Sequence, residues 1–309
     1  MSKILYAVNE YGEIIEGGIY ITPKESQRDE EIRKQRREYF ERKKQEELLK
    51  IDFTEILGSF YFVNYKKLLK IIDDDTATGF RYLYLCTFAD DSGRLIYEDD
   101  LVTHKLFRRI FRFNDAHTTS KVVDKIESLG LLHHDENGCY HINLDYYVRN
   151  TKLPEEFKGN SSRMLDIGIR RLYEMSTPKH HAMLGKIIPL LEYLNKNYNI
   201  LCSKETVYET DVACISPLTP KEICEICGRS PENYNRFINE LGKFIINRRP
   251  FVRRVVDDTE EYELNCYFVN PYIVYMGNKN NYLEFTFKLF DLGRNCVRNR
   301  YKKRRKLTQ

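Results

Sequence analysis

The 309-residue chain carries 50 lysines and arginines against 46 aspartates and glutamates, so its formal net charge is only +4 although 31% of its residues are charged. This length is sufficient for two domains that each bury a core. No apolar run approaches the roughly 20 residues of a membrane span, and residues 1–18 lack the apolar core of a secretory signal. Eight irregularly spaced cysteines fit a reducing compartment better than a disulfide framework. We therefore expect a cytoplasmic protein with no membrane partner.

The first 52 residues predict an N-terminal hairpin followed by a charged helical arm. Short apolar segments at 4–8 and 13–21 flank a turn, and Pro23 ends the hairpin. In the helical run at 24–50, many acids and bases lie three or four positions apart, as on a solvated helix. Two interpretations of this arm stay open: an exposed spacer, or a helix for dimerisation or phosphate contact.

Residues 53–150 predict a first winged-helix domain. Its predicted elements are a strand at 60–63, a helix from residue 64, a helix at 80–88, a strand at 94–96, a helix at 101–111, a third helix ending at Gly130, and a wing at 131–143. The strand at 60–63 is expected to pair with this wing. The carboxylates at 73–75 are interpreted as a helix-end loop, because no converging ligands point to a metal site.

Residues 151–178 predict a connector helix between two domains, with Ser161 or Ser162 as the cap of a helix that runs through Tyr173. Residues 179–280 predict a second winged-helix domain. Its long first helix at 180–196 should be kinked by Pro189. Residues 199–215 form an insertion with no predicted structure.

The clearest pattern lies at 216–277. Residues 220–227 predict a short amphipathic helix, and Ser230 with Pro231 should open a second one. Two strands at 251–256 and 263–269 should follow, joined by an acidic tip as a hairpin. The apolar residues of the second helix recur at the spacing of an amphipathic helix, and they are Tyr234, Phe237, Ile238 and Leu241.

The order of helix, turn, helix and two-stranded wing is typical of a winged helix-turn-helix. The sequence therefore predicts a mostly α fold with small β wings, of the α+β class. It contains two such domains in tandem after the N-terminal hairpin and charged helix. Residues 281–309 should add a C-terminal helix at 282–292 and a basic tail.

Basic and amide side chains gather on the predicted recognition elements and in the tail. Lysine and arginine neutralise phosphates and release counterions, and asparagine and arginine can pair with adenine and guanine edges. In the alternative interpretation these are ordinary polar faces of domains that bind protein. The candidate DNA-binding residues are Arg108, Arg109, Arg112, Thr118, Ser120, Lys121 and Lys125, then Asn233, Asn235, Arg236, Asn239, Arg248, Arg249, Arg253 and Arg254, and finally Lys302, Arg304 and Arg305.

We find no pattern that predicts an enzyme, a metal site or a cofactor. Cys224 and Cys227 form the only Cys-x-x-Cys pair, and no partner pair lies at zinc-finger spacing, so we interpret both as small buried side chains. The chain has no phosphate-binding Gly-x-x-x-x-Gly-Lys loop and no Gly-x-Ser-x-Gly elbow. It also lacks the two histidines, one apolar residue apart, of rolling-circle nucleases. His133 and His134 are expected on the first strand of the wing.

Three segments carry a family resemblance: FYFV at 60–63 before a Leu-Leu helix, LTPKEICEICGRSPENYNRFINEL at 218–241, and above all YFVNPYIVYMG at 267–277. Together they resemble the winged-helix replication initiators and related regulators of plasmids and phages. The resemblance implies binding of duplex DNA at an origin or operator that is often repeated or palindromic, with dimerisation through one unit. The N-terminal hairpin, the charged helix and the insertion match no initiator pattern.

From these observations we expect a DNA-binding protein of a mobile element, with replication initiation as the first expectation and transcriptional regulation as the close second. A protein-interaction module without DNA specificity is the alternative from another class. The expected partners are double-stranded DNA, a second copy of the chain, and the replication or transcription machinery.

Overall fold

The computed structural model describes residues 57–149, 153–259, 262–277, 282–284 and 286–288, and three helical residues, 31, 32 and 34. It separates the chain into Met1–Asp52 and Phe53–Gln309, and every element below belongs to the second unit. The predicted N-terminal hairpin, most of the charged arm and the basic tail with Lys302, Arg304 and Arg305 lie outside the described residues.

The described part of Phe53–Gln309 is a mixed α/β structure in which helices α2 to α10 pack with small antiparallel sheets. The prediction of helices with small sheets is confirmed at this level. Among the described residues, no helix combines the length and the apolar character that crossing a membrane requires.

A three-stranded sheet joins segments that are far apart in the chain. β1 (Phe60–Asn64) lies between β6 (Tyr147–Val148) and β7 (Ser161–Leu165), antiparallel to both. The prediction that β1 pairs with the first wing is therefore wrong. The predicted helix cap at Ser161 or Ser162 is also wrong, because both serines lie buried inside β7. The ladder to β1 outweighs the local cap signal, since the neighbouring Met164 and Leu165 are fully buried on either side of the strand.

Helix α3 (Thr76–Cys86) lies at the centre of the core. Nine of its eleven residues are buried, as expected for a helix that is covered on all sides. The side chain of Asp75 caps it by accepting a hydrogen bond from the Thr78 amide. α2 (Tyr65–Ile72) precedes it and is capped by Asn64. The carboxylates at 73–75 form the turn between the two helices, as predicted.

The helices and the hairpin predicted as the first helix-turn-helix and its wing lie within residues 96–142. α5 and the hairpin confirm the prediction, whereas the predicted helix at 101–111 begins later, since Leu101 pairs with Ile96 in a small hairpin. Gly130 ends this unit's last helix with a positive φ of 68°. The elements are β2 (Ile96–Tyr97), β3 (Asp100–Leu101), η1 (His104–Leu106), α4 (Phe107–Phe111), α5 (Ala116–Ser128), β4 (Leu132–His134) and β5 (Tyr140–Ile142).

The predicted long helix at 180–196 is broken into short pieces. The break is at Gly185 and not at Pro189. A Cβ at Gly185 would lie only 1.8 Å from the Thr76 carbonyl oxygen, so the close approach to α3 decides where the helix ends. The pieces are α7 (Pro178–Leu184), α8 (Ile187–Leu190) and η3 (Leu191–Tyr193). Before them, η2 (Glu155–Phe157) and α6 (Asp166–Met175) lie in the segment for which a connector helix was predicted. Ile187, Ile188 and Leu191 are buried as predicted.

Two helices and a long hairpin are present at 216–277, where the second helix-turn-helix was predicted, but the strands extend into the acidic segment predicted as the tip of the hairpin. The elements are α9 (Pro220–Ile226), η6 (Pro231–Asn233), α10 (Tyr234–Leu241), β8 (Ile245–Ile246), β9 (Arg249–Pro250), β10 (Val252–Thr259) and β11 (Tyr262–Val269). The insertion has a structure of its own: beside η4 (Lys204–Thr206) and η5 (Val212–Cys214), its first residues run along β11. There the Leu201 amide donates to the Tyr267 carbonyl and the Val269 amide to the Asn199 carbonyl.

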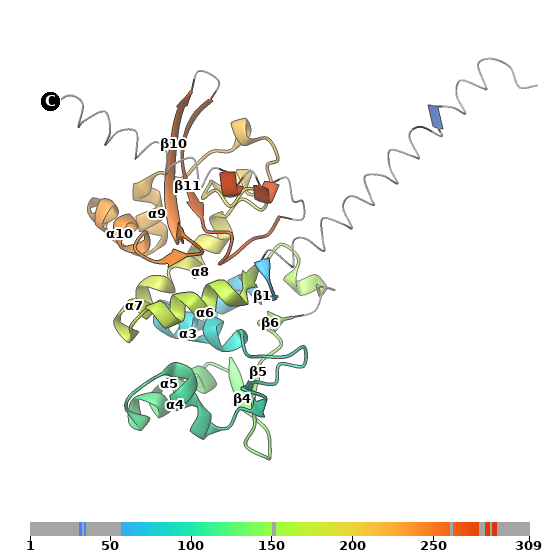
Figure 1. Cartoon of the computed structure of the whole chain (residues 1–309), viewed down its shortest axis with the longest axis vertical. Coiled ribbons are helices and arrows are strands. Elements are labelled where there is room, and N and C mark those ends of the chain that lie inside the picture. The colour runs from blue at the N-terminus through green and yellow to red at the C-terminus, as the bar shows by residue number, and fades with distance from the viewer. Residues whose placement is uncertain are drawn as a thin grey trace, which may run out of the picture. The chain divides into compact units, whose positions relative to one another are not determined.

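Within this unit, α4 and α5 lie at one end and α9 and α10 at the other, with α3, α6 and α7 between them (Figure 1). A single cluster of buried side chains runs through all of these helices. The candidate DNA-binding residues of the two predicted helix-turn-helix units are therefore carried by one continuous core.

Candidate nucleic-acid interface

Helix α9, the first helix of the second predicted helix-turn-helix, begins with a capping box. The Thr219 hydroxyl accepts a hydrogen bond from the Glu222 amide at 3.3 Å, and the Glu222 carboxylate accepts from the Thr219 amide at 2.7 Å. Hydrogen bonds from the Thr219 amide and then its hydroxyl lower the pKa of Glu222. Pro220 occupies the first helical position, so the start of α9 is well defined.

The turn between α9 and α10 depends on glycine and on two buried cysteines. Gly228 adopts a φ of +62°, which disfavours side chains, and the Arg229 amide closes the turn onto the Cys224 carbonyl at 2.8 Å. Cys224 and Cys227 are both buried, and burial raises the pKa of Cys227 to about 12. Their prediction as small buried side chains is confirmed.

The outward face of α10 carries the predicted base-reading residues. Asn235, Arg236 and Asn239 are exposed, while Phe237 and Leu241 on the opposite side are buried. Asn233, also exposed, lies in the 3₁₀ turn that precedes α10. Where the turn meets α10, the surface is hollowed to about 390 Å³, and the lining residues are Gly228, Arg229, Ser230, Asn233, Arg236, Phe237 and Glu240.

Arg236 has an intramolecular partner within this hollow. Its Nε donates to Glu240 Oε1 at 3.0 Å, and the arginine side chain is 80% exposed. Asn233 and Arg229 line the same hollow. The arrangement can offer amide and guanidinium groups together to a planar or anionic ligand.

The four arginines at the base of the long hairpin differ in their surroundings. Arg254 and Arg248 are exposed, and Arg248 lies in the left-handed region at φ +65°. Arg253 is half-buried. Arg249 is turned inward, with its guanidinium 4.4 Å from the centroid of the Phe287 ring. These arginines therefore do not form a uniform basic surface.

The guanidinium groups of the first unit are held by neighbours. Arg109 forms an ion pair of 2.6 Å with Glu98, and Arg112 forms one of 3.2 Å with Glu174. Arg108 donates to the Asn114 carbonyl at 2.8 Å. All three side chains are exposed, so these pairs are screened by water and cost little to exchange for a phosphate.

Helix α5 begins with a cap that uses one of the predicted contact residues. Asp115 accepts hydrogen bonds from the amide and the hydroxyl of Thr118, and the hydroxyl contact is the main reason for its lowered pKa. Ser120 is half-buried, 3.4 Å from His104 Nε2. Lys121 and Lys125 lie exposed on the outward face of the helix.

The paired histidines lie on β4, as predicted. The His133 ring stacks on His141 of β5 at 5.4 Å, and His134 lies 4.0 Å from the Glu127 carboxylate. Within the described part of the chain, no group of three or more histidine, cysteine or carboxylate side chains is placed to hold a metal ion.

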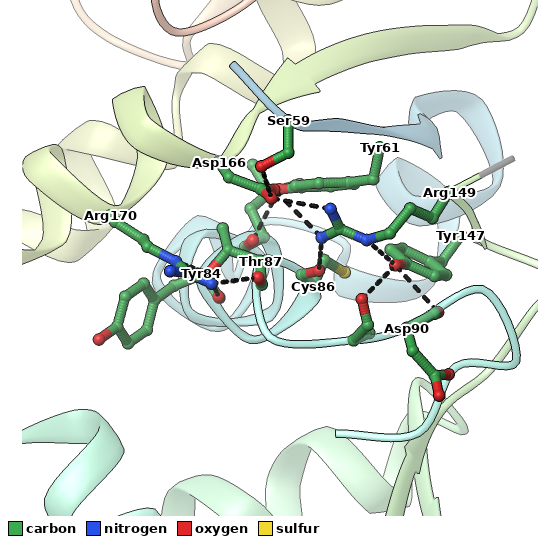
Figure 2. Close-up of polar contacts among 12 residues, drawn as sticks. Ser59, Tyr61, Tyr84, Cys86, Thr87, Asp90, Tyr147, Arg149, Asp166 and Arg170 are labelled. Carbon is green, nitrogen blue, oxygen red and sulfur yellow. Dashed lines mark hydrogen bonds and ion pairs between the residues drawn. The ribbon is translucent and has the colours of Figure 1, made fainter. Parts of the chain in front are cut away.

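A buried polar network that sequence reasoning missed lies at the C-terminus of α3. Arg149 donates to Asp166 Oδ2 at 2.7 Å, to the Tyr147 hydroxyl at 2.7 Å and to the Cys86 carbonyl at 3.0 Å (Figure 2). Burial opposes the charge of Arg149, but its hydrogen bond and ion pair with Asp166 prevail, so its pKa lies above the ordinary value. The residues come from separate elements, and no spacing in the sequence signals that they meet.

A second arginine completes this network. Arg170 on α6 donates to the Thr87 carbonyl at 2.5 Å and to its hydroxyl at 3.0 Å (Figure 2). Arg149 and Arg170 thus bind the carbonyls at the C-terminal end of α3, where the helix dipole favours cations. The network holds the end of α3 to α6.

Comparison with models of known protein families, with curated proteins and with solved structures gave no match. The interpretation of the site therefore depends on its geometry and on the sequence segments described above. Most of the predicted contact residues that the structure describes are exposed, and Ser120, Arg249 and Arg253 are half-buried.

Proposed function

We propose that the chain binds double-stranded DNA sequence-specifically through two winged helix-turn-helix domains in tandem. The observation that carries the proposal is the face of α10, where Asn235, Arg236 and Asn239 are exposed opposite the buried Phe237. In winged helices the corresponding helix enters the major groove, where asparagine and arginine pair with adenine and guanine. The first unit repeats the order of helix, turn, helix and hairpin.

The role that we propose is replication initiation at an origin of a plasmid or phage. The resemblance of residues 267–277 to the closing wing of such initiators supports it. In this segment Asn270 is fully buried, and its side chain donates to the carbonyls of Ile246 and Arg249 and accepts from the Tyr272 amide. This asparagine therefore connects the end of β11 to β8 and β9. The Asn-Pro-Tyr segment thus stabilises the hairpin beside the proposed second helix-turn-helix.

Selection from random duplexes with the full chain tests the DNA-binding proposal. Replacing Arg236 or Asn235 by alanine should cost about 1–3 kcal/mol on the selected sequence and little on random DNA. Arg171→Ala, which removes an exposed arginine from α6, is the matched control and should leave both affinities unchanged. Equal losses on selected and random DNA, or a selection that yields no sequence, would overturn the proposal.

The proposed role is tested with a plasmid that lacks its own initiator. When the selected sites are placed on it as repeats beside an origin, supplying the chain in trans should maintain the plasmid, and Arg236→Ala should abolish maintenance. Repression of a promoter by the same sites without plasmid maintenance would indicate a transcriptional regulator instead.

A further inference from the structure

The layer between the two helix-turn-helix units is packed too closely to act as a hinge. The Tyr84 and Tyr173 rings are parallel, with centroids 3.7 Å apart, and they join α3 to α6. At Gly185, between α7 and α8, a Cβ would lie 1.8 Å from the Thr76 carbonyl oxygen of α3. Since not even a Cβ atom fits where Gly185 meets the start of α3, the helices cannot slide past one another without a clash.

Direct bonds attach the first unit to this layer. The Tyr84 hydroxyl donates to the Ile110 carbonyl at 3.2 Å, and the Tyr173 hydroxyl donates to the Phe111 carbonyl at 3.1 Å. Both carbonyls belong to the last turn of α4, immediately before the turn that leads into α5. The position of α5 is therefore set by two tyrosines of the layer.

The second unit is attached to the same layer from the other side. The Leu165 amide, just before α6, donates to the Ile273 carbonyl at 2.9 Å. Gly168 on α6 packs so tightly that a Cβ would lie 1.8 Å from the Tyr272 carbonyl oxygen. Residues 270–273 hold the end of the hairpin that follows α10, so α6 and the second unit form one body.

The buried side chains are also continuous from one unit to the other. Val123 and Ile126 of α5 belong to the same cluster as Phe237 and Leu241 of α10. Any relative rotation of the two units would have to expose part of this cluster to water, which the hydrophobic effect opposes.

We propose that the shared layer joins the two units into one rigid body. This body contacts two segments of its DNA target, and the separation of these segments along the duplex is fixed. This inference rests on the proposed DNA-binding function. Two units on a flexible linker can still bind both segments when one helical turn of DNA is inserted between them, because both segments remain on the same side of the duplex. A rigid body cannot, since one turn moves a segment by about 34 Å along the duplex.

The DNA arm of the test uses the selected sequence and two versions with 5 or 10 base pairs inserted between the footprints of the two units. We expect both insertions to lower the affinity of the full chain by the same factor, about 100-fold or more, because one unit loses its contacts. Retention of most of the affinity with the 10-base-pair insertion would overturn rigidity. Unchanged affinity with both insertions would overturn the two-segment target.

The protein arm measures rigidity without DNA. Spin labels at Ser128→Cys and Lys243→Cys, both exposed and outside the predicted DNA contacts, report the distance between the units. The background carries serine at Cys139, Cys214 and Cys296. We expect one narrow distance distribution that DNA does not change, as narrow as that of a control pair within the first unit, Ser128→Cys with Asp145→Cys.

A distance distribution broader than that of the control pair, or one that shifts when DNA is added, would overturn the inference that the two units form one rigid body. These outcomes are independent of the proposed function. If the distance is fixed but no DNA sequence is selected, the proposed function fails and the two-segment target fails with it, while the measured rigidity stands.

Discussion

Lys196 keeps an ammonium group inside the protein at a cost in free energy. The residue is 8% exposed, and its Nζ has no hydrogen-bond partner among the described residues. The Tyr65 ring, whose centroid lies 5.4 Å from Nζ, offers a favourable cation–π contact. Burial lowers the Lys196 pKa to about 8, which indicates that the folded state disfavours the charged form.

Replacing this lysine by methionine should therefore stabilise the protein at neutral pH. The folded pKa lies below the ordinary value of 10.5, so the destabilisation is complete below pH 8 and disappears as the pH rises through 8 to 10.5. We expect Lys196→Met to raise the free energy of unfolding at pH 7 by up to about 3 kcal/mol. Urea denaturation at pH 7 and at pH 10 should show a gain that shrinks at the higher pH. A loss of stability at pH 7 would show that the ammonium has a favourable partner.

The lowered pKa of His181 affects the stability of the protein on the acid side of neutral pH. It is 2% exposed, accepts a hydrogen bond from Arg81 Nε at 3.2 Å, and has a pKa lowered to about 3, mainly by burial and then by the charge of Arg81. An unfolded histidine binds a proton below about pH 6.5, whereas folded His181 does not until near pH 3. Its contribution to stability is therefore complete above pH 6.5 and is lost progressively below it.

We expect this histidine to remove about 2 kcal/mol of stability between pH 7 and pH 5. Denaturation curves at the two pH values should show a smaller loss for His181→Asn than for the wild type, by about that amount. His117→Asn, which changes an exposed histidine, serves as the control and should keep the wild-type loss. Equal losses in all three proteins would show that His181 is protonated in the folded state.

At the scale of elements, the ion pair on α10 restrains the predicted recognition residue. Glu240 accepts from Arg236 at 3.0 Å and lines the same hollow. Glu240→Gln should remove a negative charge beside the expected DNA surface, and so raise affinity for duplex DNA and make its salt dependence steeper. Binding curves at several salt concentrations test this, with Glu225→Gln on the exposed face of α9 as the control. Weaker binding of Glu240→Gln would indicate that Glu240 itself contacts a base.

Elements whose ends carry local signals could be predicted from the sequence. The Asp115 cap marks the start of α5, and Ser230 with Pro231 marks the start of the helical run that leads into α10. The outward face of α10 followed from its 3.6-residue period, because the apolar positions mark the inward side, where Phe237 and Leu241 are buried and Tyr234 and Ile238 half-buried. β7 and the break at Gly185 could not be predicted, since each depends on a partner about a hundred residues away in the chain.

The partners of the charged groups were equally inaccessible to sequence reasoning. Arg112 pairs with Glu174, and Arg249 packs on Phe287, although composition alone places both arginines in a basic cluster. Their surroundings are set by elements distant in the chain, which no local spacing reveals. Charge counts therefore identified the basic segments but not which guanidinium groups a ligand can reach.

At the scale of the whole molecule, the positive charge is concentrated at the C-terminus. Residues 294–306 carry eight lysines and arginines and no acid. Deleting residues 294–309 should lower affinity for random and specific duplexes by similar factors at low salt, because such a segment attracts any polyanion. Titrations of both duplexes with the truncated and full chains measure this. Loss of sequence discrimination on truncation would show that the tail takes part in sequence recognition. Unchanged affinity at low salt would show that the tail does not contribute to DNA binding.

The central sheet has a consequence for the order in which the chain folds. β1 pairs with β7, so Tyr61 faces Met164 across the ladder after about a hundred intervening residues have been synthesised. The chain is synthesised at about 5–20 residues per second, so β7 emerges roughly 5–20 s after β1. The first helix-turn-helix has only short loops to close and can form during that interval. The sheet and the layer that depends on it should therefore assemble late, in a slow phase that follows the formation of the local helices.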